Sequence, residues 1–105
     1  MSTYVFIDRL ILGYPRFRGE DMSDMQLSPI IVGEVIARFR NRKGITQEVL
    51  SGLADIGRTH LSAIERGERK PTLETLYRIS CALDIKMSDI VISIENEIED
   101  KENIP

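Results

Sequence analysis

The chain has 105 residues, of which 42% are apolar and 30% are charged, a balance typical of a folded globular domain and not of a disordered segment. Its single cysteine, Cys81, excludes an intramolecular disulfide and fits a reducing compartment. The formal net charge of −3 is unevenly distributed, because residues 1–29 carry −1, residues 30–87 carry +3 and residues 88–105 carry −5.

Residues 1–29 are expected to form an N-terminal arm or leader outside the main domain. They hold four of the six aromatic side chains, and their apolar run TYVFIDRLIL fits a strand or a short helix equally well. We favour an extended arm. The run contains Asp8 and Arg9 and is too short for a membrane span or a secretion signal, so a cytoplasmic location is expected.

Two helices are predicted between residues 29 and 54. Ser28 and Pro29 provide an N-cap and a first-turn proline for a helix over 29–43, which ends before Gly44. Thr46 is a suitable cap for a shorter helix over 47–54. The residues expected to face inward are Val32, Val35, Ile36 and Phe39 in the first helix, and Val49, Leu50, Leu53 and Ala54 in the second.

Three further helices are predicted after a turn at residues 55–57. The third has only two large apolar residues, Leu61 and Ile64, before it ends at Gly67. Thr72 and Ser88 are the expected caps of the fourth and fifth. The expected inward face of the fourth helix is Leu73, Leu76, Tyr77, Ser80 and Leu83, with Cys81 also in the core. In the fifth helix, apolar residues recur at three- and four-residue intervals: Ile90, Val91, Ile94 and Ile98.

The third predicted helix has a free polar face. Successive helical residues are about 100° apart, so burying Leu61 and Ile64 turns the opposite side outward. The side chains on that side are polar, short and small. A helix that presents them fits a groove about 12 Å wide, the width of the DNA major groove. Thr59, Ser62, Ala63 and Arg66 point outward, and Arg58 and His60 lie on the flanks.

Three motifs in this region carry a family resemblance. They are Thr46-Gln47-Glu48, Ile64-Glu65-Arg66-Gly67, and Pro71-Thr72-Leu73-Glu74-Thr75-Leu76. These motifs, together with the apolar residues at helical spacing in the predicted helices, resemble the Cro/repressor-type helix-turn-helix domains over residues 32–91. The resemblance implies an all-α, five-helix, lambda-repressor-like domain, here with an N-terminal extended arm. The expected divisions are the arm at 1–29, the helix-turn-helix domain at 30–92, and an acidic helix end and tail at 93–105.

The resemblance also implies roles for individual residues. Arg58, Thr59 and Ala63 match base-contacting positions, with Ser62 beside them. Gln47, Arg66, Arg69 and Lys70 match phosphate-contacting positions, and His60 is expected to face a phosphate as well. Arg40 and Glu65 match an internal ion pair. An arginine fork suits the two acceptors of guanine, and the methyl groups of Thr59 and Ala63 suit thymine.

Two positions depart from the family pattern. Asp55 stands in the inter-helix turn where glycine is usual, and it can adopt a left-handed conformation at modest cost. Gly57 stands at the N-cap of the third helix where serine is frequent. Neither change threatens the fold. The run RTHLSAIERGERKPTLETL is also similar to controller proteins of restriction-modification systems.

Several residues also have an ordinary structural interpretation. Arg58, Arg69 and Lys70 fit a solvated surface, and Arg40 and Glu65 fit an exposed ion pair as well as a partly buried one. The stripe Ile90, Ile94 and Ile98 fits either closure of the monomer core or a dimer interface, and we expect the dimer interface.

The function expected from these features is sequence-specific transcriptional regulation. A homodimer would bind double-stranded DNA at a pseudo-palindromic operator. An antitoxin-like or adaptor protein, which uses its helices to bind another protein, is the alternative. No enzyme activity, metal or cofactor is expected, because the sequence contains no phosphate loop and its only histidine, His60, has no catalytic or metal-binding partner motif.

Overall fold

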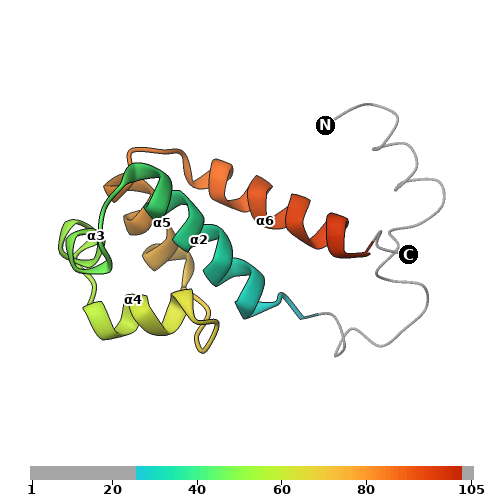
Figure 1. The fold of residues 1–105 in the computed structure, drawn as a ribbon, viewed down its shortest axis with the longest axis horizontal. Coiled ribbons are helices and arrows are strands. Elements are labelled where there is room, and N and C mark those ends of the chain that lie inside the picture. Colours follow the sequence, from blue (N-terminus) through green and yellow to red (C-terminus); the bar gives the residue numbers. More distant parts are fainter. Residues whose placement is uncertain (1–25, 103–105) are drawn as a thin grey trace.

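The computed structural model of the protein describes residues 26–102 and contains five α-helices over that range (Figure 1). No strand occurs among these residues, so the expected all-α fold is confirmed. The expected arm at 1–29 lies almost entirely outside the described residues, as do the last three residues of the tail. The helices are α2 (Pro29–Lys43), α3 (Gln47–Ala54), α4 (Arg58–Glu65), α5 (Leu73–Ala82) and α6 (Met87–Glu102).

Side-chain caps start three of the helices at the predicted residues. Ser28 Oγ accepts a hydrogen bond from the Ile31 N–H at 3.3 Å. Thr46 and Thr72 do the same for α3 and α5, each at 3.1 Å. Each cap satisfies an N–H group that has no partner within its own helix.

The start of α6 differs from the prediction. The helix begins at Met87, so Ser88 lies inside the first turn and is not the cap. The Asp89 carboxylate accepts a hydrogen bond from the Lys86 N–H at 3.2 Å. This contact gives the Lys86 N–H a partner at the start of the helix. The helix therefore starts before the position expected with Ser88 as its cap.

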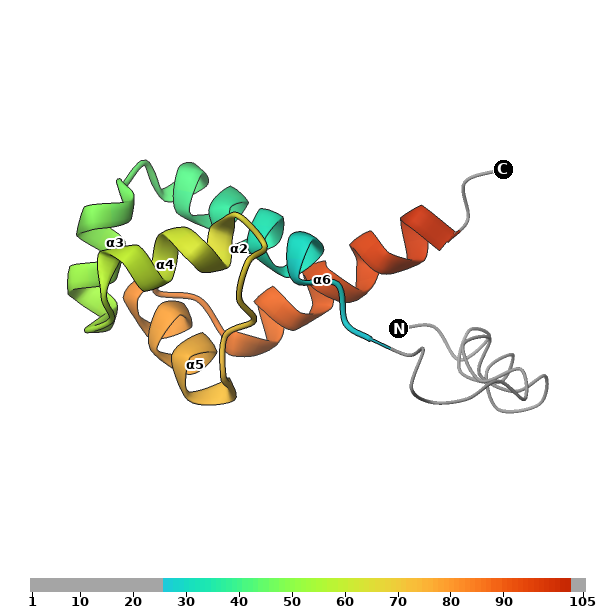
Figure 2. The same ribbon diagram turned by 90° about the horizontal axis from the view of Figure 1, so that it is seen from below.

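The helices enclose one core, and each packs against two others. α2 packs against both α4 and α6, and it lies between them in Figure 1. α3 packs against α4 and α5, and α5 packs against α6. Figure 2 shows that α6 runs on past the other helices toward the C-terminus. The buried apolar residues are Ile31, Val32, Val35, Ile36, Leu50, Ala54, Leu61, Ile64, Leu76, Ile79, Leu83, Ile90 and Ile94.

The predicted inward stripe of α2 is confirmed, but that of α3 is partly wrong. Leu50 and Ala54 are buried, whereas Val49 and Leu53 are exposed. Ser51 takes the remaining inward position and donates its hydroxyl to the Glu48 carbonyl at 3.0 Å. The hydrogen bond removes the cost of burying a hydroxyl, so a serine can face the core in place of an aliphatic side chain.

The predicted face of α5 is also rotated. Leu76, Ser80 and Leu83 are buried as expected, together with Ile79. Leu73 and Tyr77 are exposed, and so is Cys81, which is therefore not a core residue. Apolar side chains surround much of this helix, so its position against α3 and α6 decides which of them are buried.

Candidate nucleic-acid interface

α4 has the two-sided character that the sequence indicated. Leu61 and Ile64 are completely buried, and they fix the helix to the core. On the other side, Arg58 and Thr59 are exposed, while Ser62 and Ala63 are partly exposed. His60 is also partly exposed on the flank. The helix therefore offers small polar side chains and one cation at its accessible face.

The turn before α4 adopts a special backbone conformation at Asp55. This residue ends α3 in the left-handed region with φ 54°, as expected where glycine is usual. Arg78 of α5 supports the turn, since its guanidinium lies 3.4 Å from the Asp55 carbonyl oxygen and 3.5 Å from the carboxylate. Gly57 is the N-cap of α4 and supplies no side-chain hydrogen bond.

A close backbone contact at Gly33 sets the distance between α4 and α2. A Cβ atom at this buried position would overlap the carbonyl oxygens of Ile64 and Glu65. Only glycine lets the two helices approach so closely. Gly33 was not predicted from the sequence to have a structural role, although a glycine inside a predicted helix often marks close packing.

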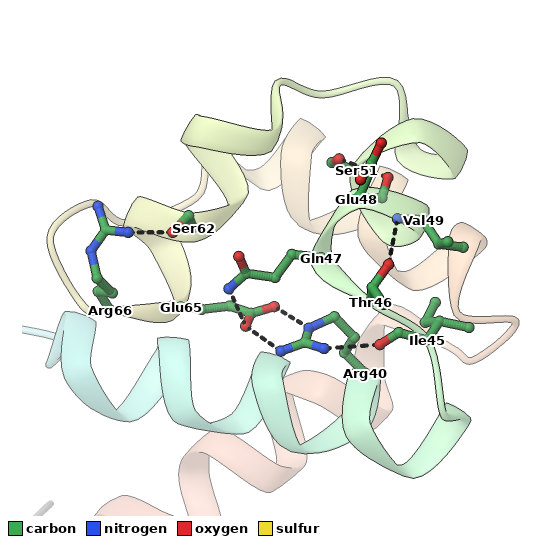
Figure 3. A network of polar contacts seen from close by, with 10 residues as sticks. All are labelled: Arg40, Ile45, Thr46, Gln47, Glu48, Val49, Ser51, Ser62, Glu65 and Arg66. Carbon is green, nitrogen blue, oxygen red and sulfur yellow. Dashed lines mark hydrogen bonds and ion pairs between the residues drawn. The ribbon is translucent and has the colours of Figure 1, made fainter.

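An ion pair between Arg40 and Glu65 joins α2 to the end of α4 (Figure 3). The guanidinium donates two hydrogen bonds to the carboxylate, at 2.7 and 2.9 Å, and a third to the Ile45 carbonyl oxygen at 2.8 Å. The two side chains are only 14% and 5% exposed, so this is a shielded pair and not a surface one. The hydrogen bonds to Glu65 raise the pKa of Arg40, because they stabilise the charged form of the guanidinium.

Gln47 extends this ion pair into a network that includes α3. Its side-chain amide donates a hydrogen bond to Glu65 at 3.0 Å (Figure 3). A primary amide has two N–H groups, so one N–H remains for another acceptor. Gln47 is partly exposed. One carboxylate thus fixes the position of an amide at the N-terminus of α3.

Arg66 ends α4 and is held by neighbours on the same surface. Its guanidinium donates to Glu68 at 2.5 and 3.2 Å and to the Ser62 hydroxyl. Figure 3 shows the contact with Ser62. Ser62, which is expected to contact a base, is therefore hydrogen-bonded to Arg66, which is expected to contact a phosphate.

The loop after α4 carries two more cations. Arg69 and Lys70 are exposed, and so is Arg58 at the other end of the helix. None of these three side chains forms an ion pair with any residue that the structure describes. Their charges face solvent, and an anionic partner can meet them without first displacing a carboxylate.

Comparison with known proteins assigns the chain to a family. A family model described as helix-turn-helix matches residues 36–90, which is more than half of the chain. This protein belongs to the helix-turn-helix family. The matched segment contains the second half of α2 and all of α3, α4 and α5, and so includes every residue of the network around Glu65.

Two relatives of this helix-turn-helix protein are regulators by name. One is an uncharacterized HTH-type transcriptional regulator, y4dJ, from Sinorhizobium fredii, 39% identical over 61 residues that cover 58% of this chain and 79% of the relative. Another is the control protein C.MunI from Mycoplasma sp, 35% identical over 66 residues that cover 62% of this chain and 89% of the relative.

A solved structure of similar fold is the restriction-modification controller protein C.AhdI from Aeromonas hydrophila. The TM-score is 0.58 at 29% sequence identity, and the match covers 59% of this chain and 94% of the other. The expected similarity to Cro/repressor-type domains and to controller proteins is thereby confirmed.

Most of the apolar stripe of α6 lies inside the monomer. Ile90 is completely buried and Ile94 is 5% exposed, because α6 packs on α2 and α5 of the same chain. Ile98 is partly buried against the same core. Ile90 and Ile94 therefore help to close the monomer core, which is the alternative interpretation of the stripe, and only Ile98 keeps part of its surface for a second chain.

Neither a metal-binding cluster nor a membrane-spanning helix occurs in the described part of the chain. No group of three or more His, Cys, Asp or Glu side chains in residues 26–102 is placed to hold a metal ion. None of the helices in that range is long and apolar enough to span a membrane.

Proposed function

We propose that this protein is a sequence-specific, DNA-binding transcriptional regulator that inserts α4 into the major groove. The observation that carries the proposal is the division of α4 into a buried apolar edge and an accessible polar face. A helix with its side chains is about 10–12 Å across, and the major groove is about 12 Å wide. The helix-turn-helix family assignment supports the same function.

In this proposal four residues of α4 contact bases. The Arg58 guanidinium can donate to both acceptors of guanine, and Thr59 and Ala63 offer methyl groups to thymine. Ser62 offers a hydroxyl. All four are accessible on the same helix. The proposed base contacts are therefore Arg58, Thr59, Ser62 and Ala63.

A second set of residues contacts the phosphate backbone and positions the helix. Gln47 suits this role because Glu65 fixes its amide while one N–H stays free. Arg69 and Lys70 suit it because their charges are unpaired among the described residues. Phosphate contacts contribute affinity for DNA of any sequence, whereas base contacts determine which sequence is preferred. The proposed phosphate contacts are Gln47, His60, Arg66, Arg69 and Lys70, of which Arg66 is paired with Glu68 and must leave that carboxylate to reach a phosphate.

The regulator is further proposed to bind as a homodimer. Two copies of α4 must then lie about one DNA turn apart, roughly 34 Å, and the operator is a pseudo-palindrome. Because Ile90 and Ile94 are buried, we place the contact with a second chain on apolar side chains that α5 and α6 leave exposed. The candidates are Leu73, Tyr77, Val91 and Ile92.

Selection of bound sequences from random duplex DNA tests this function. The full chain is used at two salt concentrations, and bound duplexes are sequenced. We expect an inverted repeat whose half-sites are about 10 base pairs apart, centre to centre, and weaker binding at the higher salt. If no sequence is enriched and no duplex is retained at low salt, the DNA-binding proposal is wrong and a protein-interaction module becomes the better account.

A further inference from the structure

Among the cations of the proposed DNA interface, Arg66 differs in having its charge neutralised within the chain. Its Nε and Nη2 atoms face the two oxygens of Glu68, and Nη1 faces the Ser62 hydroxyl. All three nitrogens of the guanidinium are thus engaged. Arg58, Arg69 and Lys70 have no ion-pair partner in residues 26–102, so only Arg66 of these four meets a carboxylate.

The backbone places Glu68 opposite Arg66. Gly67 adopts a left-handed conformation with φ 79°. The Glu68 N–H donates to the Ala63 carbonyl at 2.9 Å, and the Gly67 N–H donates to the Ile64 carbonyl at 3.0 Å. These hydrogen bonds form the turn that ends α4. Glu68 therefore reaches Arg66 from a fixed backbone position.

Glu68 and Arg66 are both ionised at neutral pH. The hydrogen bonds from Arg66 hold the pKa of Glu68 below its usual range, and the same contact raises the pKa of Arg66. A duplex near this end of α4 meets a neutral pair and not a free cation. To reach a phosphate, Arg66 must leave Glu68, and the carboxylate then remains beside the anionic backbone.

We infer that Glu68 is an internal competitor of DNA for Arg66 and lowers the affinity of the protein for every duplex, whatever its sequence. This inference rests on the proposed function. It assigns a role to a residue outside the proposed set of base and phosphate contacts. Its physical basis is that binding releases counterions in proportion to the phosphates neutralised, and a cation already paired with Glu68 adds nothing to that number.

The test compares Glu68→Gln with a matched control, Glu74→Gln. Glu74 pairs with Arg78 on the exposed side of α5 at 3.4 Å, so both variants remove one carboxylate from an exposed ion pair and change the net charge equally. Binding of each full-length protein to a mixed-sequence duplex of about 30 base pairs is titrated between 50 and 200 mM salt. Circular dichroism verifies that both variants are folded.

We expect Glu68→Gln to bind more tightly than the wild type, by about three- to tenfold at 50 mM salt, and Glu74→Gln to change affinity much less. The plot of log affinity against log salt should become steeper by about 0.9 for Glu68→Gln. Its advantage over the wild type should therefore shrink about 3.5-fold between 50 and 200 mM salt.

A second pair of variants separates competition from a general charge effect. Arg66→Gln should weaken binding less than about twofold in the wild-type background, and should remove most of the gain in the Glu68→Gln background. Equal affinities and slopes for Glu68→Gln and Glu74→Gln overturn the inference, as does an equal effect of Arg66→Gln in both backgrounds. If the wild type binds no duplex at 50 mM salt, the proposed function fails and the inference fails with it. If the wild type binds but the variants behave alike, only the inference fails.

Discussion

Glu65 joins three helices through a single carboxylate. It lies at the end of α4 and accepts hydrogen bonds from Arg40 of α2 and Gln47 of α3. Arg40 in turn donates to the Ile45 carbonyl in the loop between α2 and α3. A shielded carboxylate without these donors would lose most of what compensates its removal from water. The network therefore couples the stability of the fold to the position of Gln47.

Arg40→Met is expected to lower the free energy of unfolding by about 3–5 kcal/mol, because it leaves the Glu65 charge shielded and without its ionic partner. Urea denaturation followed by circular dichroism measures the loss. The control is Arg38→Met, which breaks the exposed pair of Arg38 with Glu97 and should cost about 0–1 kcal/mol. Similar losses for the two variants would show that shielding is not what makes the Arg40 pair important.

Two further substitutions distinguish base contacts from phosphate contacts. Arg58→Ala should change the preferred base at one position in each half-site, at a cost of about 1–3 kcal/mol on the best sequence and much less on random DNA. Lys70→Ala should weaken binding to both by a similar factor. Competition titrations with cognate and random duplexes measure both effects. Equal losses on the two duplexes for Arg58→Ala would contradict its role as a base contact.

Residue-level predictions from the sequence succeeded where a motif fixed the partners. The resemblance implied a contact between Arg40 and Glu65, and the structure places the two side chains together. The hydrogen bond from Gln47 to Glu65 and the pairing of Arg66 with Glu68 were not foreseen. Both depend on how side chains from different elements, or across the turn at Gly67, are oriented in space, which helical spacing does not specify.

At the scale of the helix, α4 was predicted well because it has only two large apolar residues and hence one possible inward face. α5 was predicted poorly because Leu73, Tyr77 and Cys81 continue the apolar surface beyond its buried edge. α3 was intermediate, since Ser51 occupies an inward position. Periodicity identifies a helix, but neighbouring helices decide which part of a wide apolar surface is buried.

Gly33→Ala tests the close packing of α2 on α4. The added methyl group has no space against the carbonyl oxygens of Ile64 and Glu65, so the helices must move apart, and we expect a loss of about 1–3 kcal/mol in unfolding free energy. Gly52→Ala is the control, because that helical glycine is exposed and has no atom within 4 Å of an added Cβ.

The control should raise stability by about 0.5–1 kcal/mol, since alanine is the better helix former. Thermal and urea unfolding of both variants give the comparison. A stabilising effect of Gly33→Ala similar to that of Gly52→Ala would mean that α2 and α4 are not held in close backbone contact in solution.

For the whole molecule, the fold separates the acidic helix from the proposed DNA-binding face. α6 carries all of the charged side chains of residues 88–105 and lies on the other side of α2 from α4 (Figure 1). Charges separated by more than about 8 Å of solvent are largely screened at physiological salt. The net charge of −3 is therefore a poor measure of the charge that α4 presents to an anionic duplex, because residues 30–87 carry +3.

The proposed dimer yields a prediction at the same scale. Sedimentation equilibrium should give a mass near twice the 12.0 kDa of one chain. Val91→Asp combined with Ile92→Asp should shift the protein toward monomer, because each change places a charge on the exposed apolar surface of α6 and a buried charge opposes contact with a second chain. Leu53→Asp, at an exposed apolar residue of α3, should not. A monomeric wild type, or equal dissociation by both sets of changes, would contradict this surface.

Methylation of guanine N7 tests the central claim, that the outer face of α4 reads bases in the major groove. N7 lies in the major groove and is one of the two guanine acceptors proposed for Arg58. We predict that the bound wild-type protein shields a guanine N7 in each half-site of the selected sequence, and that Arg58→Ala, at a concentration that saturates the duplex, restores methylation there. Unchanged methylation of every guanine N7 in the saturated complex would contradict the account.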